Sequence, residues 1–199
     1  MPSKSAKPVA KRSIYQLKIT LRWSKPPIWR RIQVDSEITL KKLHHVIQQT
    51  MGWTDSHLHQ FVVRGVYFSD PQFELEHTRS ESTIRLNQIV PREGLSFTYE
   101  YDFGDGWQHE VKVEKIIESE SAKKARPVCL AGKRACPPED CGGTGGYYNL
   151  LRALADPKHE DHRMLTEWIG GSFDPEAFDL DTVNALLGPQ GDPRQKRLL

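Results

Sequence analysis

The sequence predicts an α+β protein in which two or three C-terminal helices pack on a mixed or antiparallel sheet. Three observations predict this class. Apolar and polar residues alternate in several segments between residues 14 and 113, which is the pattern of half-buried strands. Apolar residues recur at helical spacing after residue 39 and again after residue 146. The order of a hairpin, a helix and further strands is that of a β-grasp-like opening.

The length and the two ends of the chain limit the expected domain. The 199 residues are enough for one well-buried core, and we expect a single domain over residues 14–188. Residues 1–13 carry four Lys or Arg residues and no acid, which predicts a basic disordered tail, and residues 189–199 are expected to be frayed. No apolar run approaches the roughly 20 residues that span a bilayer, and the N-terminus lacks the apolar segment of a secretory signal. We therefore expect a cytoplasmic protein that does not associate with a membrane.

The first segment of the domain predicts a hairpin. Alternating residues indicate one half-buried strand face: Tyr15, Leu17, Ile19, Leu21 and Trp23. Pro26 and Pro27 force a turn, because proline cannot donate to a sheet ladder. A second strand follows, with its residues divided between two faces: Ile28, Arg30, Ile32 and Val34 on one, and Trp29, Arg31 and Gln33 on the other.

A helix and two further strands are expected next. Thr39 is an N-cap residue and Gly52 supplies a left-handed stop for a helix with one apolar stripe, formed by Leu40, Leu43, Ile47 and Met51. A strand over residues 58–63 turns at Gly65 into a short strand over residues 66–68. Residues 69–95 are polar and predict a long irregular loop with one apolar patch over residues 84–89.

Residues 97–113 predict the clearest hairpin. Apolar residues alternate on both sides of the turn segment 104–106: Phe97, Tyr99, Tyr101 and Phe103 before it, and Trp107, His109, Val111 and Val113 after it. A two-residue loop would place Val111 opposite Glu100. A three-residue loop with Gly106 in the left-handed conformation keeps both apolar sets on one face, and it predicts three pairs: Tyr101 with His109, Tyr99 with Val111, and Phe97 with Val113.

The remainder of the chain predicts a long loop and then helices. Residues 119–146 are rich in Gly, Pro and Cys and are expected to be loop. Three apolar stripes follow, around Tyr147, Trp168 and Leu186. The second helix is expected to start at Asp156 and Pro157, as cap and first position, and to end before residues 170–171; the third is expected to end at Gly188.

Four segments together resemble one family: residues 57–61 (HLHQF), 101–109 (YDFGDGWQH), 135–143 (ACPPEDCGG) with Gly146 and Tyr147, and 173–179 (FDPEAFD). From about Ile14 to Leu187, the chain resembles the plasmid pRiA4b Orf3-like family. The resemblance implies a compact α+β domain and an association with plasmids and transposable elements. It implies little about activity, and no family catalytic residues are carried over.

The cysteines form one candidate metal site. Cys129, Cys136 and Cys141 lie close together in the sequence, and an odd number of cysteines is a poor disulfide framework. Three thiolates could bind structural zinc together with His109 or His57, although the spacing is not that of paired CxxC motifs. The alternative is that these small side chains fill gaps where the loop packs on the sheet.

The histidines and aspartates form a second candidate metal site. On a strand, His57 and His59 would share a face and could bind one ion, with Asp102, Asp105 and His109 as further ligands from the end of the hairpin. Such a site suits zinc, manganese or iron and leaves a position open for water. The alternative is that the histidines are ordinary surface or core-edge residues and Asp105 only forms the turn.

The first hairpin carries a candidate binding surface. Its basic and aromatic side chains could stack on bases or cover phosphates: Arg22, Lys25, Trp29, Arg30 and Arg31. The alternative is ordinary strand packing with solvated arginines.

Two functions of different classes follow from these candidates. The preferred hypothesis is a non-catalytic binding or accessory module for nucleic acid, or for a protein of a mobile element, acting through the basic hairpin edge and the tail. The alternative is a metal-dependent enzyme, a hydrolase, in which the His/Asp site holds a zinc or other divalent ion and a carboxylate such as Glu139 or Asp140 activates water.

Overall fold

The computed structural model describes residues 12–119 and 124–188 of the chain. The strands are β1 (Arg12–Leu21), β2 (Trp29–Asp35), β3 (His59–Val63), β4 (Val66–Ser69), β5 (Thr78–Ser80), β6 (Ser96–Tyr101), β7 (Trp107–Ser119) and β8 (Val128–Lys133). The helices are α1 (Leu40–Met51), α2 (Leu86–Ile89), α3 (Gly143–Ala155), α4 (His162–Ile169) and α5 (Leu180–Leu187), with a short 3₁₀ turn η1 (Pro71–Phe73).

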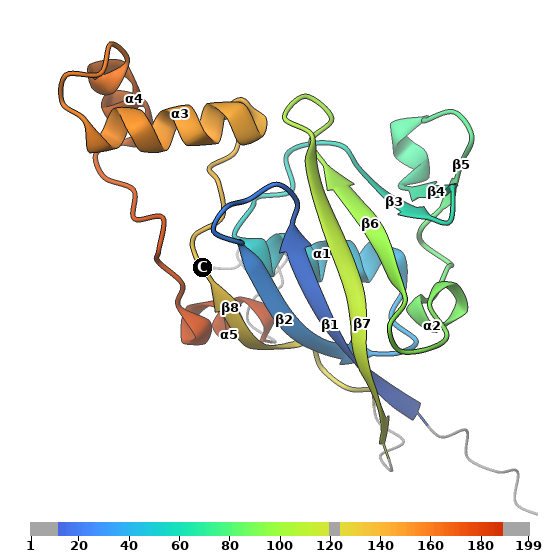
Figure 1. Ribbon diagram of the computed structural model, residues 1–199. Helices are drawn as coiled ribbons and strands as arrows, with labels where there is room; N and C mark the ends of the chain where they lie inside the picture. Colours follow the sequence, from blue (N-terminus) through green and yellow to red (C-terminus); the bar gives the residue numbers. More distant parts are fainter. Residues whose placement is uncertain (1–11, 120–123, 189–199) are drawn as a thin grey trace, which may run out of the picture.

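Within the described residues the strands form one eight-stranded sheet in the order β5-β4-β3-β6-β7-β1-β2-β8. Neighbouring strands are antiparallel except for the parallel pair β4 and β5. In Figure 1, α1 lies behind the sheet, and α3 and α4 stand at one end of it. The predicted α+β class with a mixed sheet is confirmed, and β1, β2, α1 and β3 are its hairpin, helix and strand opening.

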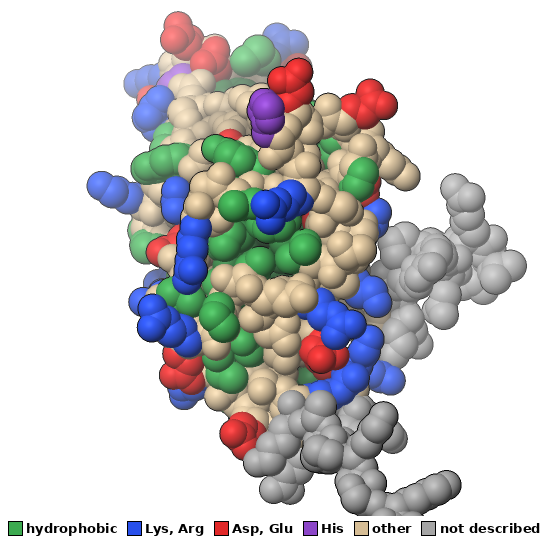
Figure 2. All heavy atoms as spheres, turned by 90° about the vertical axis from the view of Figure 1, so that its right-hand side faces the viewer, with side chains coloured by type: hydrophobic (Ala, Val, Ile, Leu, Met, Phe, Trp, Pro, Cys, Tyr) green, Lys and Arg blue, Asp and Glu red, His purple; other side chains and the backbone are tan. Residues whose placement is uncertain are grey.

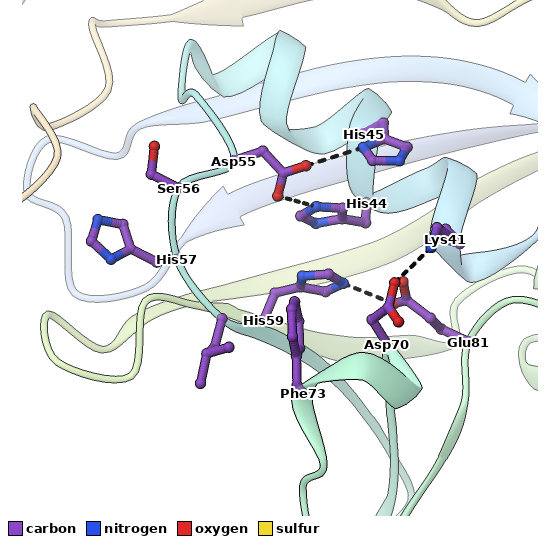
Figure 3. A pocket seen from close by; sticks show the side chains of 11 residues that line it. Lys41, His44, His45, Asp55, Ser56, His57, His59, Asp70, Phe73 and Glu81 are labelled. Atoms are coloured by element: carbon purple, nitrogen blue, oxygen red, sulfur yellow. Dashed lines mark hydrogen bonds and ion pairs between the residues drawn. The ribbon is translucent and has the colours of Figure 1, made fainter.

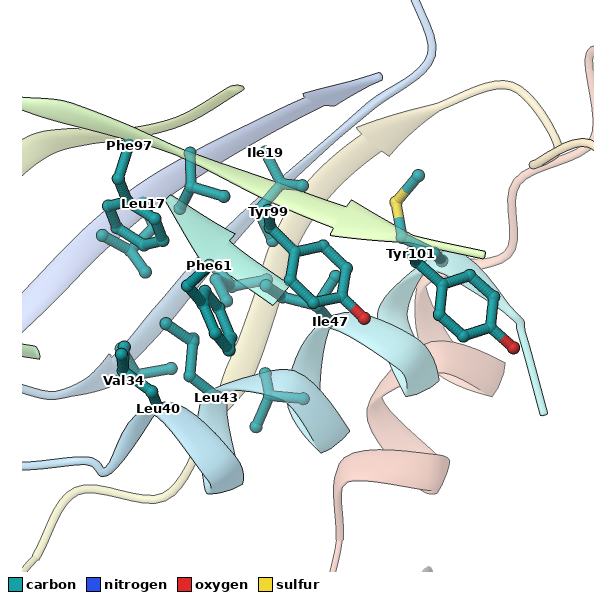
Figure 4. Close-up of a cluster of buried hydrophobic side chains, with 14 of the residues drawn as sticks. Leu17, Ile19, Val34, Leu40, Leu43, Ile47, Phe61, Phe97, Tyr99 and Tyr101 are labelled. Atoms are coloured by element: carbon teal, nitrogen blue, oxygen red, sulfur yellow. The ribbon is translucent and has the colours of Figure 1, made fainter. Parts of the chain in front are cut away.

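The core lies between the sheet and α1. Alternate residues of the strands face the helix and are buried, among them Leu17, Ile19, Phe61, Phe97 and Tyr99. They meet the apolar stripe of α1, as Figure 4 shows. Burial of these apolar faces is the main favourable contribution to folding. The other strand face, which carries Gln16, Lys18 and Arg31, is only partly exposed and polar.

The helix α1 has the caps that its sequence predicts. The Thr39 hydroxyl accepts a hydrogen bond from the Lys42 amide at 3.4 Å, and Gly52 ends the helix at φ 95°. Its buried face is not purely apolar, because His44 and Gln48 are 1% and 2% exposed. These two polar residues lie four positions apart, so they share one side of the helix.

The predicted hairpin of residues 97–113 exists, but its predicted register is wrong by two residues. Tyr101 pairs with Trp107, Tyr99 with His109, and Phe97 with Val111. Asp102 adopts a left-handed conformation at φ 56°. Its Oδ1 atom accepts hydrogen bonds from the amides of Gly104 and Asp105 at 2.9 and 3.3 Å. This side-chain-supported turn lengthens the connection, and the shift of two residues keeps the apolar faces inward.

Several segments expected to be loop contain regular structure. The loop predicted over residues 119–146 contains β8, which pairs with β2, and α3 already begins at Gly143. Residues 69–95 contain η1, β5 and α2. Trp23, placed by the alternation on a half-buried strand face, is 60% exposed, because β1 ends at Leu21.

The ends of the elements refine the remaining expectations. The helix α4 begins at His162 rather than at residues 156–157, whereas its stop at Gly170 and the end of α5 before Gly188 agree with the sequence. The first strand begins at Arg12, two residues before the expected start of the domain. Residues 1–11 and 189–199, which hold most of the two expected tails, lie outside the described residues. In the part of the chain that the structure covers, no helix has the length and apolar character needed to cross a membrane.

Candidate metal centre

A pocket of about 430 Å³ opens where α1, the start of β3 and the segment of residues 70–81 meet. Histidine and carboxylate side chains from all three segments line it: His44, His45, Asp55, His59 and Glu81. Figure 3 shows these side chains pointing toward one another. We call this group the histidine pocket.

Two buried imidazoles form the floor of the histidine pocket. The rings of His44 and His59 are stacked, with centroids 3.5 Å apart and planes at 5°. Their exposures are 1% and 3%. Burial in a region of low dielectric constant disfavours the charged form of an imidazole, and it lowers the pKa of His44. A neutral imidazole is the form that binds a metal ion.

Hydrogen bonds determine which nitrogen of His44 faces the pocket. The Gln48 amide donates to the Tyr99 hydroxyl at 2.9 Å, and that hydroxyl lies 2.8 Å from His44 Nδ1. Since the Tyr99 hydroxyl already accepts a hydrogen bond, its own proton is free to be donated to Nδ1. His44 Nε2 then carries the proton of this imidazole and donates it to the Asp55 carboxylate at 2.6 Å, so an ion bound at Nε2 would take the place of this proton.

Asp55 is held as a carboxylate by the histidines around it. Burial raises its pKa, but hydrogen bonds from His44 and His45 outweigh this effect and hold the pKa of Asp55 well below its usual range. One carboxylate oxygen faces His44 and the other lies 3.4 Å from His45 Nδ1. The Asp55 amide also donates to the Gln48 side chain at 3.0 Å, and this hydrogen bond attaches Asp55 to α1.

His59 leaves one buried nitrogen without a partner. Its Nε2 atom lies 2.8 Å from Glu81, whose side chain is fully buried. The carboxylate accepts the Nε2 proton, so the lone pair resides on Nδ1. Neither His59 Nδ1 nor the second oxygen of Glu81 has a hydrogen-bond partner among the described residues. An unsatisfied buried polar atom costs about 1–3 kcal/mol, so such an atom calls for a ligand.

These contacts bring together three potential metal ligands. His44, Asp55 and His59 each offer a ligand atom, and the three atoms lie within 4.8 Å of one another. Tyr99 and Glu81 bind the far nitrogens of the two imidazoles. Outer partners of this kind fix the orientation of metal-binding histidines in proteins.

The structure divides the predicted His/Asp site into two groups. His57 precedes β3, so it does not share a strand face with His59 as expected, and the two histidines belong to different groups of potential ligands. His57 lies with Asp102 and Asp140, whose ligand atoms are within 4.8 Å of one another. His59 belongs to the histidine pocket.

Two predicted ligands take no part in either group. His109 is fully buried and its Nδ1 atom lies 3.3 Å from the Tyr99 carbonyl, because the corrected register moves it away from the hairpin end. Burial lowers the pKa of His109 to about 4, so its imidazole is neutral. The Asp105 carboxylate instead accepts a hydrogen bond from the Gly142 amide at 3.2 Å.

The three cysteines do not join a ligand group. Cys129 lies in β8, where its thiol donates to the Ala131 carbonyl, whereas Cys136 and Cys141 lie in the following loop. Burial raises the pKa of Cys136, and it raises the pKa of Cys141 to about 12, so these thiols are protonated. In residues 12–119 and 124–188, no cysteine belongs to a cluster of three potential ligands.

The residues of the predicted basic edge point to different sides of the sheet. Arg30 is 3% exposed, because its alternate position on β2 faces inward, and its guanidinium donates to the Thr50 carbonyl and lies 4.6 Å from the ring of Phe178. Its assignment to a surface edge is therefore corrected. Trp29 and Arg31 lie on the outer face, where Arg31 binds Glu114.

The two remaining edge residues lie near the end of β1. The Arg22 guanidinium donates to Thr98 at 3.1 Å and to Gln108 at 3.4 Å. Lys25 is exposed in the hairpin turn, and its amide donates to the Tyr148 hydroxyl.

Sequence reasoning missed four residues of the histidine pocket: His44, His45, Asp55 and Glu81. His44 lies three residues before Ile47 and four after Leu40, so a polar side chain on the apolar stripe was the available signal. Asp55 and Glu81 follow no periodic pattern, and only the tertiary fold brings them to the imidazoles.

Comparisons with known proteins match most of the chain to the family that its sequence motifs resemble. The model of the plasmid pRiA4b ORF-3-like protein family matches residues 13–182. The protein y4hQ of Sinorhizobium fredii, described as uncharacterized, is 40% identical over 178 residues, which cover 88% of this chain and 91% of the relative. A crystal structure of MM3350 from Methanosarcina mazei Go1, a protein of unknown function, is similar with a TM-score of 0.75 and 38% identity. It covers 85% of this chain and 97% of MM3350.

The matched residues include all three of the motifs that meet around residues 57, 102 and 140. The family match and the 40% identical relative agree over nearly the whole described domain. The chain belongs to the plasmid pRiA4b ORF-3-like protein family.

Proposed function

We propose that this protein is a metal-dependent hydrolase whose ion is bound by His44, Asp55 and His59. The observation that carries the proposal is the buried Nδ1 atom of His59, which has no hydrogen-bond partner among the described residues and belongs to this three-ligand group. An ion at this point would satisfy that atom. It would also compensate the negative charge of Asp55 and of the buried Glu81 carboxylate.

The ligand set indicates the class of ion. Two imidazoles and one carboxylate suit zinc, and also manganese or iron, better than magnesium or calcium. Three protein ligands leave a coordination position for water, as in zinc hydrolases. Zinc lowers the pKa of its bound water to about 7, which supplies a hydroxide nucleophile at neutral pH.

The pocket supplies a group that could take the proton of this water. His45 is 51% exposed at its side chain and lines the same pocket as the three ligands. Imidazole is the most frequent general base in enzymes, and the Asp55 oxygen at 3.4 Å from its Nδ1 would orient the ring. Glu139, considered from the sequence as a base, is instead occupied by hydrogen bonds to Thr54 and Tyr101.

The proposal is tested by metal content and activity measured on the same preparations. Full-length protein, loaded with zinc, is assayed on p-nitrophenyl esters of acetate and of phosphate, and its zinc is counted by elemental analysis. We expect the wild type to hold one tightly bound zinc and to hydrolyse these esters. His59→Ala should lose both the zinc and the hydrolytic activity. His77→Ala, which changes an exposed histidine, is the matched control. Zinc content or hydrolysis that persists unchanged in folded His59→Ala would overturn the proposal.

A second candidate function is binding of nucleic acid, or of a protein of a mobile element, on the outer face of the sheet. Lys18 and Arg31 both lie over the ring of Trp29, at 5.3 and 5.2 Å from its centroid. An aromatic ring flanked by cations suits stacking on a base beside a phosphate. Against this, Arg31 is neutralised by Glu114. Figure 2 faces a different side of the molecule, the right-hand side of Figure 1 with β4 and β5, where Lys and Arg side chains surround a hydrophobic area.

The binding candidate makes a separate prediction. Affinity for single-stranded DNA or RNA should fall steeply as salt rises, and it should drop when residues 1–11 are removed, a deletion that leaves β1 whole. Trp29→Ala should weaken it further, whereas the exposed Trp168→Ala should not. Binding that is absent at low salt, or that does not respond to salt, would exclude this candidate.

A further inference from the structure

We propose a second divalent-cation site formed by His57, Asp102 and Asp140 at the rim of the sheet. It shares no ligand with the histidine pocket, so it does not depend on the function proposed above. Its three residues come from three loops: the one before β3, the hairpin turn after β6, and the loop before α3. Because His57 also lines the histidine pocket, this second ion would lie close to the pocket.

The three ligand atoms already face one another. His57 Nε2 lies 3.2 Å from an oxygen of Asp140 and 3.8 Å from Oδ2 of Asp102. The Nε2 atom is itself buried, yet it makes no hydrogen bond with any of the described residues. Two carboxylate oxygens and one nitrogen that converge without a hydrogen bond could be bridged by a cation.

The two carboxylate oxygens of Asp102 have different roles: one stabilises the turn, and the other can bind an ion. Oδ1 accepts hydrogen bonds from the Gly104 and Asp105 amides within the turn. Oδ2, which lies near His57, is the oxygen left to bind an ion. The turn therefore fixes the direction of the ligand atom before any ion arrives, which lowers the cost of binding.

Hydrogen bonds between the loops hold the other two ligands in place. The Glu139 carboxylate accepts from the Thr54 amide and hydroxyl and from the Tyr101 hydroxyl, which joins the loop of Asp140 to the chain just before His57. The Gly142 amide donates to Asp105 at 3.2 Å. At Gly143 a side chain is excluded, because its Cβ would lie 2.5 Å from the Asp105 carbonyl.

The ligand chemistry distinguishes this site from the histidine pocket. One imidazole and two carboxylates form an oxygen-rich site, which suits a hard ion such as Mn²⁺ better than the two imidazoles of the histidine pocket do. Asp140 is 71% exposed at its side chain, so the ion would keep water ligands and exchange with solvent. We therefore expect weaker binding here than in the histidine pocket.

The test is a Mn²⁺ titration of the full-length protein that already carries one equivalent of zinc, with free Mn²⁺ read from its electron paramagnetic resonance signal. Wild-type protein and the control His77→Ala should bind one Mn²⁺. His57→Ala and Asp140→Asn should each weaken this binding at least tenfold. Asp140→Asn changes an exposed side chain, so it separates loss of the ligand from loss of the fold, which circular dichroism checks.

His59→Ala distinguishes the two sites. This variant should retain Mn²⁺ binding even if it loses zinc. A loss of Mn²⁺ affinity in His57→Ala would support the second site even if the histidine pocket binds no metal. Unchanged Mn²⁺ affinity in both His57→Ala and Asp140→Asn would overturn the second site. Mn²⁺ binding that is lost only in His59→Ala would also overturn it, because the ion would then sit in the histidine pocket.

Discussion

The imidazole rings of His44 and His59 lie face to face, with centroids 3.5 Å apart and planes at 5°. Each ring is fixed at its far side by a different part of the fold, His44 by Tyr99 of β6 and His59 by the buried Glu81. Two imidazoles at this distance repel each other when both are protonated. Their burial and contacts therefore favour a neutral pair. The lone pair of His59 Nδ1 is available to an ion, whereas His44 Nε2 would first lose the proton that it donates to Asp55, and the two parallel rings would tilt toward the ion.

Tyr99→Phe tests the outer partner of His44. The change removes one hydroxyl and leaves the Gln48 amide and His44 Nδ1 without a buried partner. We expect the free energy of unfolding to fall by about 1–3 kcal/mol and zinc affinity to fall about 10–100-fold. Urea denaturation and zinc competition measure the two effects. Tyr67→Phe, at an exposed position of β4, is the control, and equal stability of the two variants would argue against the network.

Glu81→Gln should change the metal-free and zinc-bound proteins in opposite directions. Without metal, the variant removes a fully buried charge that has one unsatisfied oxygen, so its stability should equal or exceed that of the wild type. With zinc, the weaker outer partner of His59 should reduce affinity about tenfold, which lowers the stabilisation by saturating zinc by about 1.4 kcal/mol. Thermal unfolding with and without zinc measures both, with the exposed Glu76→Gln as control. A parallel loss in both states would contradict this role.

The buried His109 should make the folded state sensitive to acid. Burial lowers its pKa to about 4 in the folded chain, whereas an unfolded histidine has a pKa near 6.5. Below pH 6.5 the unfolded chain binds a proton that the folded chain does not, so stability falls as the pH falls from 6.5 to 4. The loss is roughly 3 kcal/mol in total. Denaturation across this range should show a shallower slope for His109→Leu, and identical slopes would contradict the assignment.

Glu139→Ala should release the loop before α3. Its carboxylate is the acceptor for Thr54 and Tyr101, so three hydrogen bonds are lost. We expect a loss of stability of about 1–3 kcal/mol and faster trypsin cleavage after Arg134, which is 6% exposed in the intact fold. Glu160→Ala, at an exposed position, should change neither. Cleavage at the wild-type rate would show that other contacts hold the loop.

Much of the fold follows from local patterns, because burial on one face imposes a period on the sequence. The alternation in β1 and β2 and the stripe of α1 predict those elements with nearly correct ends. The strand β8 was missed, because it is short, contains Ala131 and Gly132 and follows a proline, so only its pairing with β2 makes it a strand. The hairpin register depends on hydrogen bonds of the Asp102 side chain, which no period reveals.

The candidate site was only partly predictable for a related reason. The motifs with His57, Asp102 and Asp140 do meet in space, as the order of the strands brings their loops to one rim. The pairing of His57 with His59 assumed one strand, but β3 begins only at His59. Glu81 reaches His59 from a separate segment 22 residues later, so its role could come only from the tertiary structure.

The most direct measurement is the anomalous diffraction of a crystal of the full chain grown with zinc and recorded at the zinc absorption edge. The account predicts a strong peak about 2.0–2.1 Å from His59 Nδ1 and from His44 Nε2, with an Asp55 oxygen at a similar distance. A zinc-saturated crystal with no peak in the histidine pocket, or with zinc bound only through the cysteines, would contradict it.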